Sequence, residues 1–172
     1  EGVDVIFAGA GLPLDLPGLV DESSNTKLVP IVSSARAAKI IIKRWYDKYN
    51  YVPDAFVLEG PKAGGHLGFK PNQIDDPEFA LEKIVVEMVE ELKPFEEKFN
   101  KSIPIIAGGG IYTGEDIYNI MKLGASGVQM ATRFVTTHEC DASLDFKNTY
   151  INAEKEDIGI IKSPVGMPGR AI

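Results

Sequence analysis

The sequence predicts an α/β fold built on parallel β-strands. Its strand candidates are short runs that are apolar at nearly every position, which is typical of parallel strands covered on both faces. Segments with helical spacing of apolar residues separate most of these runs, and glycine-rich stretches follow several of them. Alternation of strands and helices leaves two architectures, a doubly wound open sheet and a (β/α)8 barrel. Both place their chemistry at the carboxyl ends of the strands.

Each expected element follows from one of these patterns. The apolar runs predict strands at residues 3–8, 28–32, 55–58, 103–107 and 127–130. Helices are predicted at residues 34–49, 77–99, 113–123 and 141–153. In the first two helices apolar residues recur three and four positions apart, as one buried face requires. Pro77 suits a first helical turn, Pro94 is expected to end or kink its helix, and Thr113 is expected to be an N-cap.

Composition excludes several classes of protein. The chain has 172 residues, 44% of them hydrophobic, which is enough to bury a core and argues against disorder. Its net charge of −7 has the wrong sign for neutralising nucleic-acid phosphates. No run approaches the ~18 uncharged apolar residues of a membrane span. A lone cysteine, Cys140, excludes a disulfide framework and fits a reducing compartment, so we expect a cytoplasmic protein. No metal-ligand spacing is present.

The first candidate site follows the fourth predicted strand. Gly108, Gly109 and Gly110 lie between that strand and the helix at 113–123. Glycines let a ligand approach the backbone, and a helix N-terminus offers unpaired N–H groups, so the segment suits a phosphate. A tight turn that needs positive φ explains the same glycines equally well.

The second candidate site follows the fifth predicted strand. The residues there are Gln129, Met130, Ala131 and Thr132. In a barrel the next strand would bring Ala131 and Thr132 beside Gly109 and Gly110, and the last two loops of such barrels often form one phosphate site. Thr132 could donate its hydroxyl to the phosphate, or it could be the N-cap of a following turn.

The third candidate site follows the strand at 55–58. His66 lies in a loop with Gly64 and Gly65, where an imidazole can be a general base or a hydrogen-bond donor near neutral pH. A loop histidine bonded only to backbone is the alternative. Glu59, at the strand end, could orient a bound ring or His66, or be a solvated or paired carboxylate. His138 lacks a glycine-rich setting and is interpreted as structural or exposed.

These three segments together resemble the nitronate monooxygenase family, formerly called 2-nitropropane dioxygenases, and the related FMN-dependent type II enoyl-ACP reductases. The resemblance rests on the segments 59–68, 104–111 and 124–134, of which Ala63-Gly64-Gly65-His66 is the most specific. It implies a (β/α)8 barrel that holds FMN noncovalently, with His66 as the catalytic residue. The cofactor-binding residues implied are Glu59, Gly64, Gly65, Gly108, Gly109, Gly110, Gln129, Met130, Ala131 and Thr132.

The resemblance also implies the extent of the domain. Residues 1–172 would be the C-terminal part of one FMN-binding barrel, covering strands four to eight, and 154–172 would begin an appended segment. Open barrel edges invite association, so a homo-oligomer is expected.

The implied reaction is FMN-dependent oxidation of alkyl nitronates by O2 to a carbonyl compound and nitrite. One alternative is reduction of an enoyl thioester with NAD(P)H. Another is an inactive fragment that needs a partner or an oligomer.

Overall fold

A five-stranded parallel sheet forms the centre of the molecule. The computed structural model describes residues 2–21, 23–164 and 166–172. The sheet order is β1-β2-β3-β5-β6, so neighbouring strands follow one another along the chain. The strands are β1 (Val5–Ala8), β2 (Lys27–Val32), β3 (Phe56–Glu59), β5 (Ile105–Gly108) and β6 (Gly127–Gln129). All five predicted strands are therefore present.

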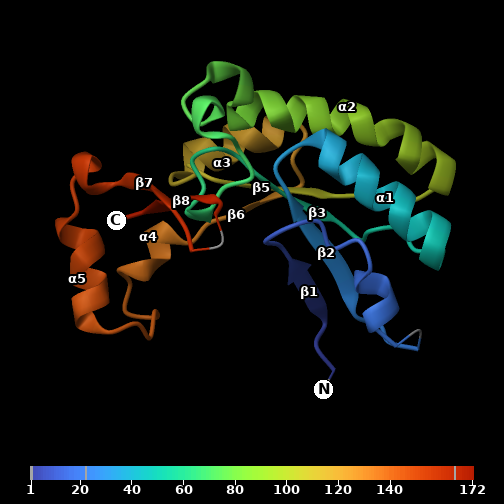
Figure 1. Ribbon diagram of the computed structural model, residues 1–172, viewed down its shortest axis with the longest axis horizontal. Coiled ribbons are helices and arrows are strands. Elements are labelled where there is room, and N and C mark those ends of the chain that lie inside the picture. The colour runs from blue at the N-terminus through green and yellow to red at the C-terminus, as the bar shows by residue number, and fades with distance from the viewer. Residues whose placement is uncertain (1, 22, 165) are drawn as a thin grey trace.

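Strand order and helix placement distinguish between the two architectures. A doubly wound sheet reverses its strand order at a switch point and carries helices on both faces. Here the order never reverses, and α1 (Ala35–Tyr49) and α2 (Leu81–Phe99) lie side by side on one face (Figure 1). The fold is therefore a partial (β/α)8 barrel, with its helices outside.

The helix boundaries follow largely from capping, and α2 differs from the prediction in two respects. The Ser34 hydroxyl accepts a hydrogen bond from the Ala37 amide at the start of α1, and Asn50 ends this helix with φ of 51°. A 3₁₀ turn, η3 (Pro77–Phe79), precedes α2, which therefore begins at Leu81. Of the two alternatives for Pro94, the end of the helix is wrong, because α2 continues to Phe99, and the kink stays a prediction. Apolar side chains on both sides of Pro94 pack on the core, which outweighs one lost backbone hydrogen bond.

The outer face of the sheet carries the main hydrophobic core. Trp45 of α1, Met88 of α2 and Phe56 of β3 are completely buried there. Each such side chain contributes about 1.5–3 kcal/mol on burial. This core fixes the sheet against its helices and thereby fixes where the strand ends lie.

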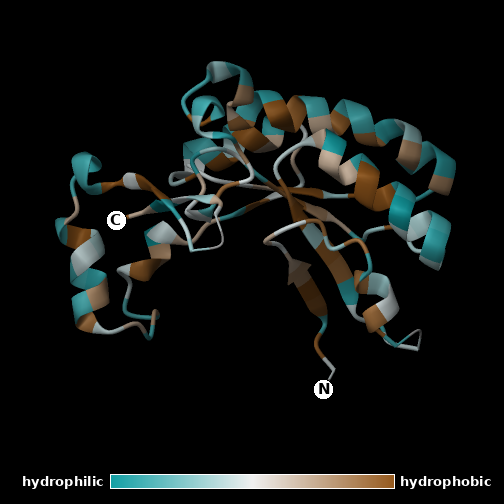
Figure 2. Cartoon of the chain, viewed as in Figure 1, coloured by the Kyte–Doolittle hydropathy of each residue, from teal (hydrophilic) through white to brown (hydrophobic). Residues whose placement is uncertain are grey.

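The inner face carries a smaller cluster that is incompletely covered. Val29 and Val57 are buried on it, with Ile31 and Ile106 partly buried around them. Phe7 pairs with Val29 in parallel register, so its side chain lies on this same face, yet Phe7 is 53% exposed. The apolar colour of β1 at the margin of the molecule is visible in Figure 2. The inner face is therefore apolar and open at β1.

The rest of the chain contains the two remaining predicted helices, at 113–123 and 141–153, and also elements that the sequence did not indicate. A second sheet has the antiparallel order β4-β8-β7. Its strands are β4 (Gly65–His66), β7 (Gly159–Lys162) and β8 (Pro168–Ala171). The other elements are η1 (Leu16–Leu19), η2 (Pro71–Gln73), α3 (Gly114–Lys122), α4 (Thr132–Val135), α5 (Leu144–Asn152) and η4 (Lys155–Asp157).

The last two strands show that the region 154–172 packs against the loop after β3 through the second sheet. That region contains η4, β7 and β8, and β8 pairs with the candidate histidine strand β4. Whether the region also begins an appended segment stays a prediction. None of the helices in the described part of the chain combines the length and the apolar character of a membrane span.

Candidate functional site

The carboxyl ends of β3, β5 and β6 place three of the expected residues in one row. Glu59 is in register with Gly108, and Gly108 with Gln129. The Gln129 Nε2 donates a hydrogen bond to the Glu59 Oε1 at 3.3 Å. Burial raises the pKa of the Glu59 carboxyl, and the Gln129 hydrogen bond lowers it by less. Glu59 is thus a half-buried carboxyl on the inner face, paired with a neutral amide.

His66 lies beside this row. The imidazole belongs to the exposed strand β4, and it shares with Glu59 a hollow of about 190 Å³. Ser33 and Ser34, at the start of α1, line the same hollow. The structure therefore brings together the predicted histidine and the predicted carboxyl, which are seven positions apart in sequence. The serines add hydroxyl groups that can bond to a ligand.

The glycine turn after β5 packs against the histidine loop. Gly109 has φ of 99° and Gly110 has φ of 82°, so both need the left-handed region. A Cβ at Gly109 would lie 2.9 Å from the Ala63 amide nitrogen, and one at Gly110 would lie 2.9 Å from the Lys62 Cδ. The tight turn therefore requires both glycines. This confirms the second of the two interpretations, a turn that needs positive φ. A phosphate role is compatible with this turn and stays a proposal.

The segment after β6 lies next to that turn. Thr132 is the first residue of α4, and Ala131 occupies the N-cap position, so the alternative in which Thr132 is the N-cap is wrong. Arg133 Nη1 donates to the Tyr112 carbonyl at 3.3 Å, which ties α4 to the loop after β5. Met130 packs partly on the main core. The two glycine-rich segments therefore meet, as expected for adjacent barrel strands.

The N-terminus of α3 does not offer all its donors to a ligand. Asp116 Oδ2 accepts hydrogen bonds from the amides of Tyr112, at 3.0 Å, and Thr113, at 2.7 Å. The Thr113 hydroxyl in turn accepts from the Asp116 amide, which completes a capping box and confirms Thr113 as the N-cap. The backbone bond from Thr113 is the main cause that lowers the pKa of Asp116. The expectation of unpaired N–H groups is therefore wrong at these two positions.

Other backbone groups remain suited to a phosphate-bearing cofactor. Within the described residues, the amides of Gly109 and Gly110 make no hydrogen bond to protein. Around Gly64 and Gly65 a Cβ would meet no atom within 4 Å, so this backbone faces open space. The free amides of Gly109 and Gly110 fit the phosphate of a flavin mononucleotide. The open backbone at Gly64 and Gly65 fits its ring.

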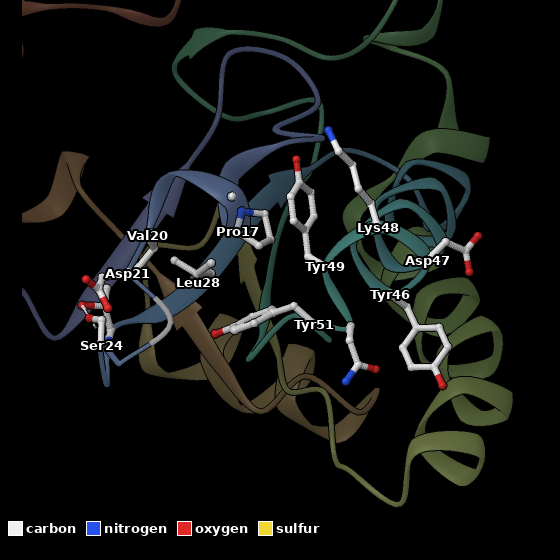
Figure 3. A pocket seen from close by; sticks show the side chains of 13 residues that line it. Pro17, Val20, Asp21, Ser24, Leu28, Tyr46, Asp47, Lys48, Tyr49 and Tyr51 are labelled. Atoms are coloured by element: carbon white, nitrogen blue, oxygen red, sulfur yellow. Dashed lines mark hydrogen bonds between the residues drawn. The ribbon is translucent and has the colours of Figure 1, made fainter.

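A larger hollow lies elsewhere. It has a volume of about 1160 Å³ and is lined by Tyr46, Tyr49 and Tyr51 at the end of α1, close to the start of β2 (Figure 3). Nearby, Asp15 is bonded to Lys48, the Tyr49 hydroxyl and Arg44, which hold the pKa of its carboxyl well below the usual range. The hollow is at the amino ends of the strands, where barrels do not place chemistry.

Two residues near the site were missed by sequence reasoning. Met167 lines the hollow with His66, and Arg170 of β8 donates to the Pro61 carbonyl at 3.1 Å. Both lie about a hundred positions from the histidine loop. No local signal marks such a pair, because only the pairing of β8 with β4 brings them there.

Known proteins match this arrangement. A family model described as nitronate monooxygenase matches residues 1–172. A protein of Staphylococcus aureus strain Newman described as "Probable nitronate monooxygenase" is 37% identical over 122 residues, which are 69% of this chain and 31% of that protein. The chain therefore spans about a third of the length of the curated relatives it matches.

Solved structures give the same architecture. FabK from Thermotoga maritima superimposes with a TM-score of 0.74 and 28% identity, over 98% of this chain and 46% of that one. The enoyl reductase domain of MlnA from Bacillus amyloliquefaciens gives a TM-score of 0.64 at 18% identity, over 98% of this chain and 44% of that one, which supports the fold alone.

Proposed function

The chain belongs to the nitronate monooxygenase family, whose members are FMN-dependent oxidoreductases, and we propose that it forms the part of such an enzyme that holds the flavin and carries its histidine. The observation that carries the proposal is the meeting of Glu59, Gln129 and His66 at the strand ends, beside two glycine turns. A flavin site needs open backbone, phosphate donors and a proton-handling side chain close together.

The cofactor would be held largely by backbone. The amides of Gly109 and Gly110 suit the phosphate, with Thr132 adding its hydroxyl from the adjacent segment. Gly64 and Gly65 would let the histidine loop approach the flavin ring. Gly108, Met130 and Ala131 complete the strand-end surface, and the Glu59–Gln129 pair offers polar atoms to the ring edge.

The proposed reaction is oxidation of an alkyl nitronate by O2 to a carbonyl compound and nitrite. Bound FMN supplies electron acceptance and reaction with oxygen. His66 would bind the nitronate oxygens, or remove the α-proton of a neutral nitroalkane at its ring nitrogen. Its exposed place in the hollow supports either role, because a substrate can reach the imidazole there.

A second candidate is reduction of an enoyl thioester with NAD(P)H. The superposition on FabK, with a TM-score of 0.74, favours it. His66 would then place the substrate or assist its protonation. A third candidate treats this stretch as inactive until other strands cover the inner face, which the exposure of Phe7 supports. We place the protein in the cytoplasm, since the single Cys140 fits a reducing compartment.

Flavin bleaching separates these candidates. The full-length protein, loaded with FMN, is mixed without oxygen with propyl-2-nitronate, NADH or NADPH, and absorbance near the flavin band is followed. We expect bleaching by the nitronate and stable colour with either nucleotide. Rapid bleaching by NAD(P)H alone selects the reductase. The third candidate is tested on the 172-residue chain itself, where absence of flavin binding and of turnover selects the inactive stretch.

A variant tests the histidine. We expect His66→Asn to keep FMN and lose most nitronate turnover, because asparagine can donate a hydrogen bond but cannot accept the proton. General acid–base groups typically contribute about 10²–10⁴-fold. Turnover at the wild-type rate would remove His66 from the proposed chemistry. His138→Asn is the matched control and should change nothing.

A further inference from the structure

The histidine loop is fixed by a strand from the far end of the chain. β8 pairs with β4 so that Gly169 lies opposite His66 and Arg170 lies opposite Gly65. The Leu67 amide also donates to the Pro168 carbonyl at 2.8 Å. β7 covers the other edge of β8, so the second sheet is a hairpin with the histidine strand added to it. The backbone of His66 is thus set by residues about a hundred positions away.

Arg170 adds a side-chain contact to the beginning of the same loop. Its Nη2 donates to the Pro61 carbonyl at 3.1 Å. Its Nε is buried and has no hydrogen-bond partner among the described residues. The same described part of the chain offers no carboxylate within 4 Å of the guanidinium. A partly buried guanidinium with one neutral acceptor is a poor source of stability, because its desolvation is not compensated by an opposite charge.

The loop between these two contacts has little support of its own. Gly64 and Gly65 have no neighbour where a side chain would lie, and Gly65 has φ of 71°. Glycines have the largest conformational freedom to lose, so this stretch needs external contacts to hold one shape. Arg170 provides two of them, since its backbone lies opposite Gly65 and its side chain reaches Pro61.

We propose that Arg170 is a positioning residue for His66. It fixes the 61–66 loop at both ends and so sets where the imidazole lies in the hollow, without touching substrate or cofactor. The catalytic consequence rests on the proposed function, whereas the structural consequence does not. Because a misplacement of about 1 Å can cost about 10²-fold in rate, loosening the loop should act on kcat.

The test compares Arg170→Ala with Arg170→Lys in the FMN-loaded full-length protein. Arg44→Ala is the control, because it removes another guanidinium held by one acceptor at 3.1 Å, here Asp15, which also bonds to Lys48 and Tyr49 of the remote hollow. Hydrogen–deuterium exchange should quicken in residues 61–67 for Arg170→Ala and stay unchanged in β3 and β5. FMN affinity should fall much less than kcat, because the phosphate is assigned to the Gly109 and Gly110 amides outside this loop, while kcat for the nitronate falls about 10–100-fold. Arg170→Lys should recover part of kcat, since its ammonium can reach one carbonyl.

A double-mutant cycle completes the test. If Arg170 acts through His66, Arg170→Ala should cost no further activity in a His66→Asn background. Additive losses would overturn the proposal, and so would unchanged exchange in 61–67. Quickened exchange in a protein that shows no nitronate turnover would support the positioning role and count against the proposed reaction only. Loss of FMN together with a fall in Tm would assign Arg170 to general stability and overturn it.

Discussion

At the scale of the residue, Glu59 carries the clearest electrostatic signature of the strand-end row. Its pKa is raised from 4.5 because burial disfavours the charged form, and the Gln129 amide compensates only in part. A raised folded-state pKa means that the folded protein binds this proton more tightly than the unfolded chain. Stability therefore falls as the pH rises from about 4.5 through the folded pKa, and the full penalty remains at neutral pH.

Glu59→Gln should remove that penalty. The amide keeps the oxygen that accepts from Gln129 but carries no charge, so we expect greater stability at pH 7 and no difference from wild type below about pH 4. The gain should be small, because the Glu59 carboxyl is only half buried and solvent screens its charge. Thermal unfolding from pH 4 to 8 measures it, with the exposed Glu87→Gln as the matched control. A gain that is the same at every pH would show that charge is not its cause.

Gly109 illustrates a residue whose structural role limits what can replace it. Alanine there combines φ of 99° with a Cβ 2.9 Å from the Ala63 amide nitrogen, a backbone atom that cannot move aside cheaply. We expect Gly109→Ala to cost about 1–3 kcal/mol and to weaken FMN binding, because the turn displaces the amides proposed for the phosphate.

Gly114→Ala is the control for this variant. A Cβ at Gly114 meets nothing within 4 Å, and the position is the first of α3, so alanine should be neutral or slightly stabilising. Urea unfolding measures the stability of both variants, and flavin fluorescence titration measures their affinity for FMN. Equal stability of the two alanine variants would contradict the strain assigned to Gly109.

At the scale of the element, the capping box of α3 shows which signals a sequence carries. Thr113 and Asp116 stand three positions apart, and the structure confirms both halves of their exchange of hydrogen bonds. The strands β4 and β8 were missed for the opposite reason. β8 is Pro-Gly-Arg-Ala, which has neither alternation nor strand-forming residues, so only its partners make it a strand.

Thr113→Ala tests the cap. The variant leaves the Asp116 amide without its acceptor, and the expected loss is about 0.5–2 kcal/mol. Thr149→Ala is the control, because its hydroxyl bonds within α5 to the Asp145 carbonyl and caps nothing. Urea unfolding of the two variants gives the comparison. If both lose the same free energy, the hydroxyl at Thr113 is acting as a surface group and not as a cap.

At the scale of the whole molecule, the parts that could be predicted were those encoded locally. The five parallel strands follow from apolar runs, and the glycine segments with His66 follow from their places after strands. The partners of the histidine loop could not be predicted, since Met167 and Arg170 reach it only through the tertiary fold. The continuation of α2 through Pro94 was likewise decided by packing of the helix on the core.

The open inner face leads to a prediction about association. Val5 and Phe7 are 41% and 53% exposed on β1, an edge strand whose inner side continues the apolar cluster of Val29 and Val57. Exposed edges with apolar side chains pair with other chains, and burying one phenylalanine contributes about 1.5–3 kcal/mol. We therefore expect the 172-residue chain to self-associate through β1.

Phe7→Lys should shift this chain toward monomer in sedimentation velocity, because a lysine on the inner face would have to be buried in the contact. Leu19→Lys is the matched control. Leu19 is 83% exposed but lies in η1, away from the cluster, so its replacement should leave the distribution unchanged. A wild-type chain that stays monomeric at tens of micromolar would contradict the prediction. Equal effects of the two lysines would assign association to general surface hydrophobicity and not to β1.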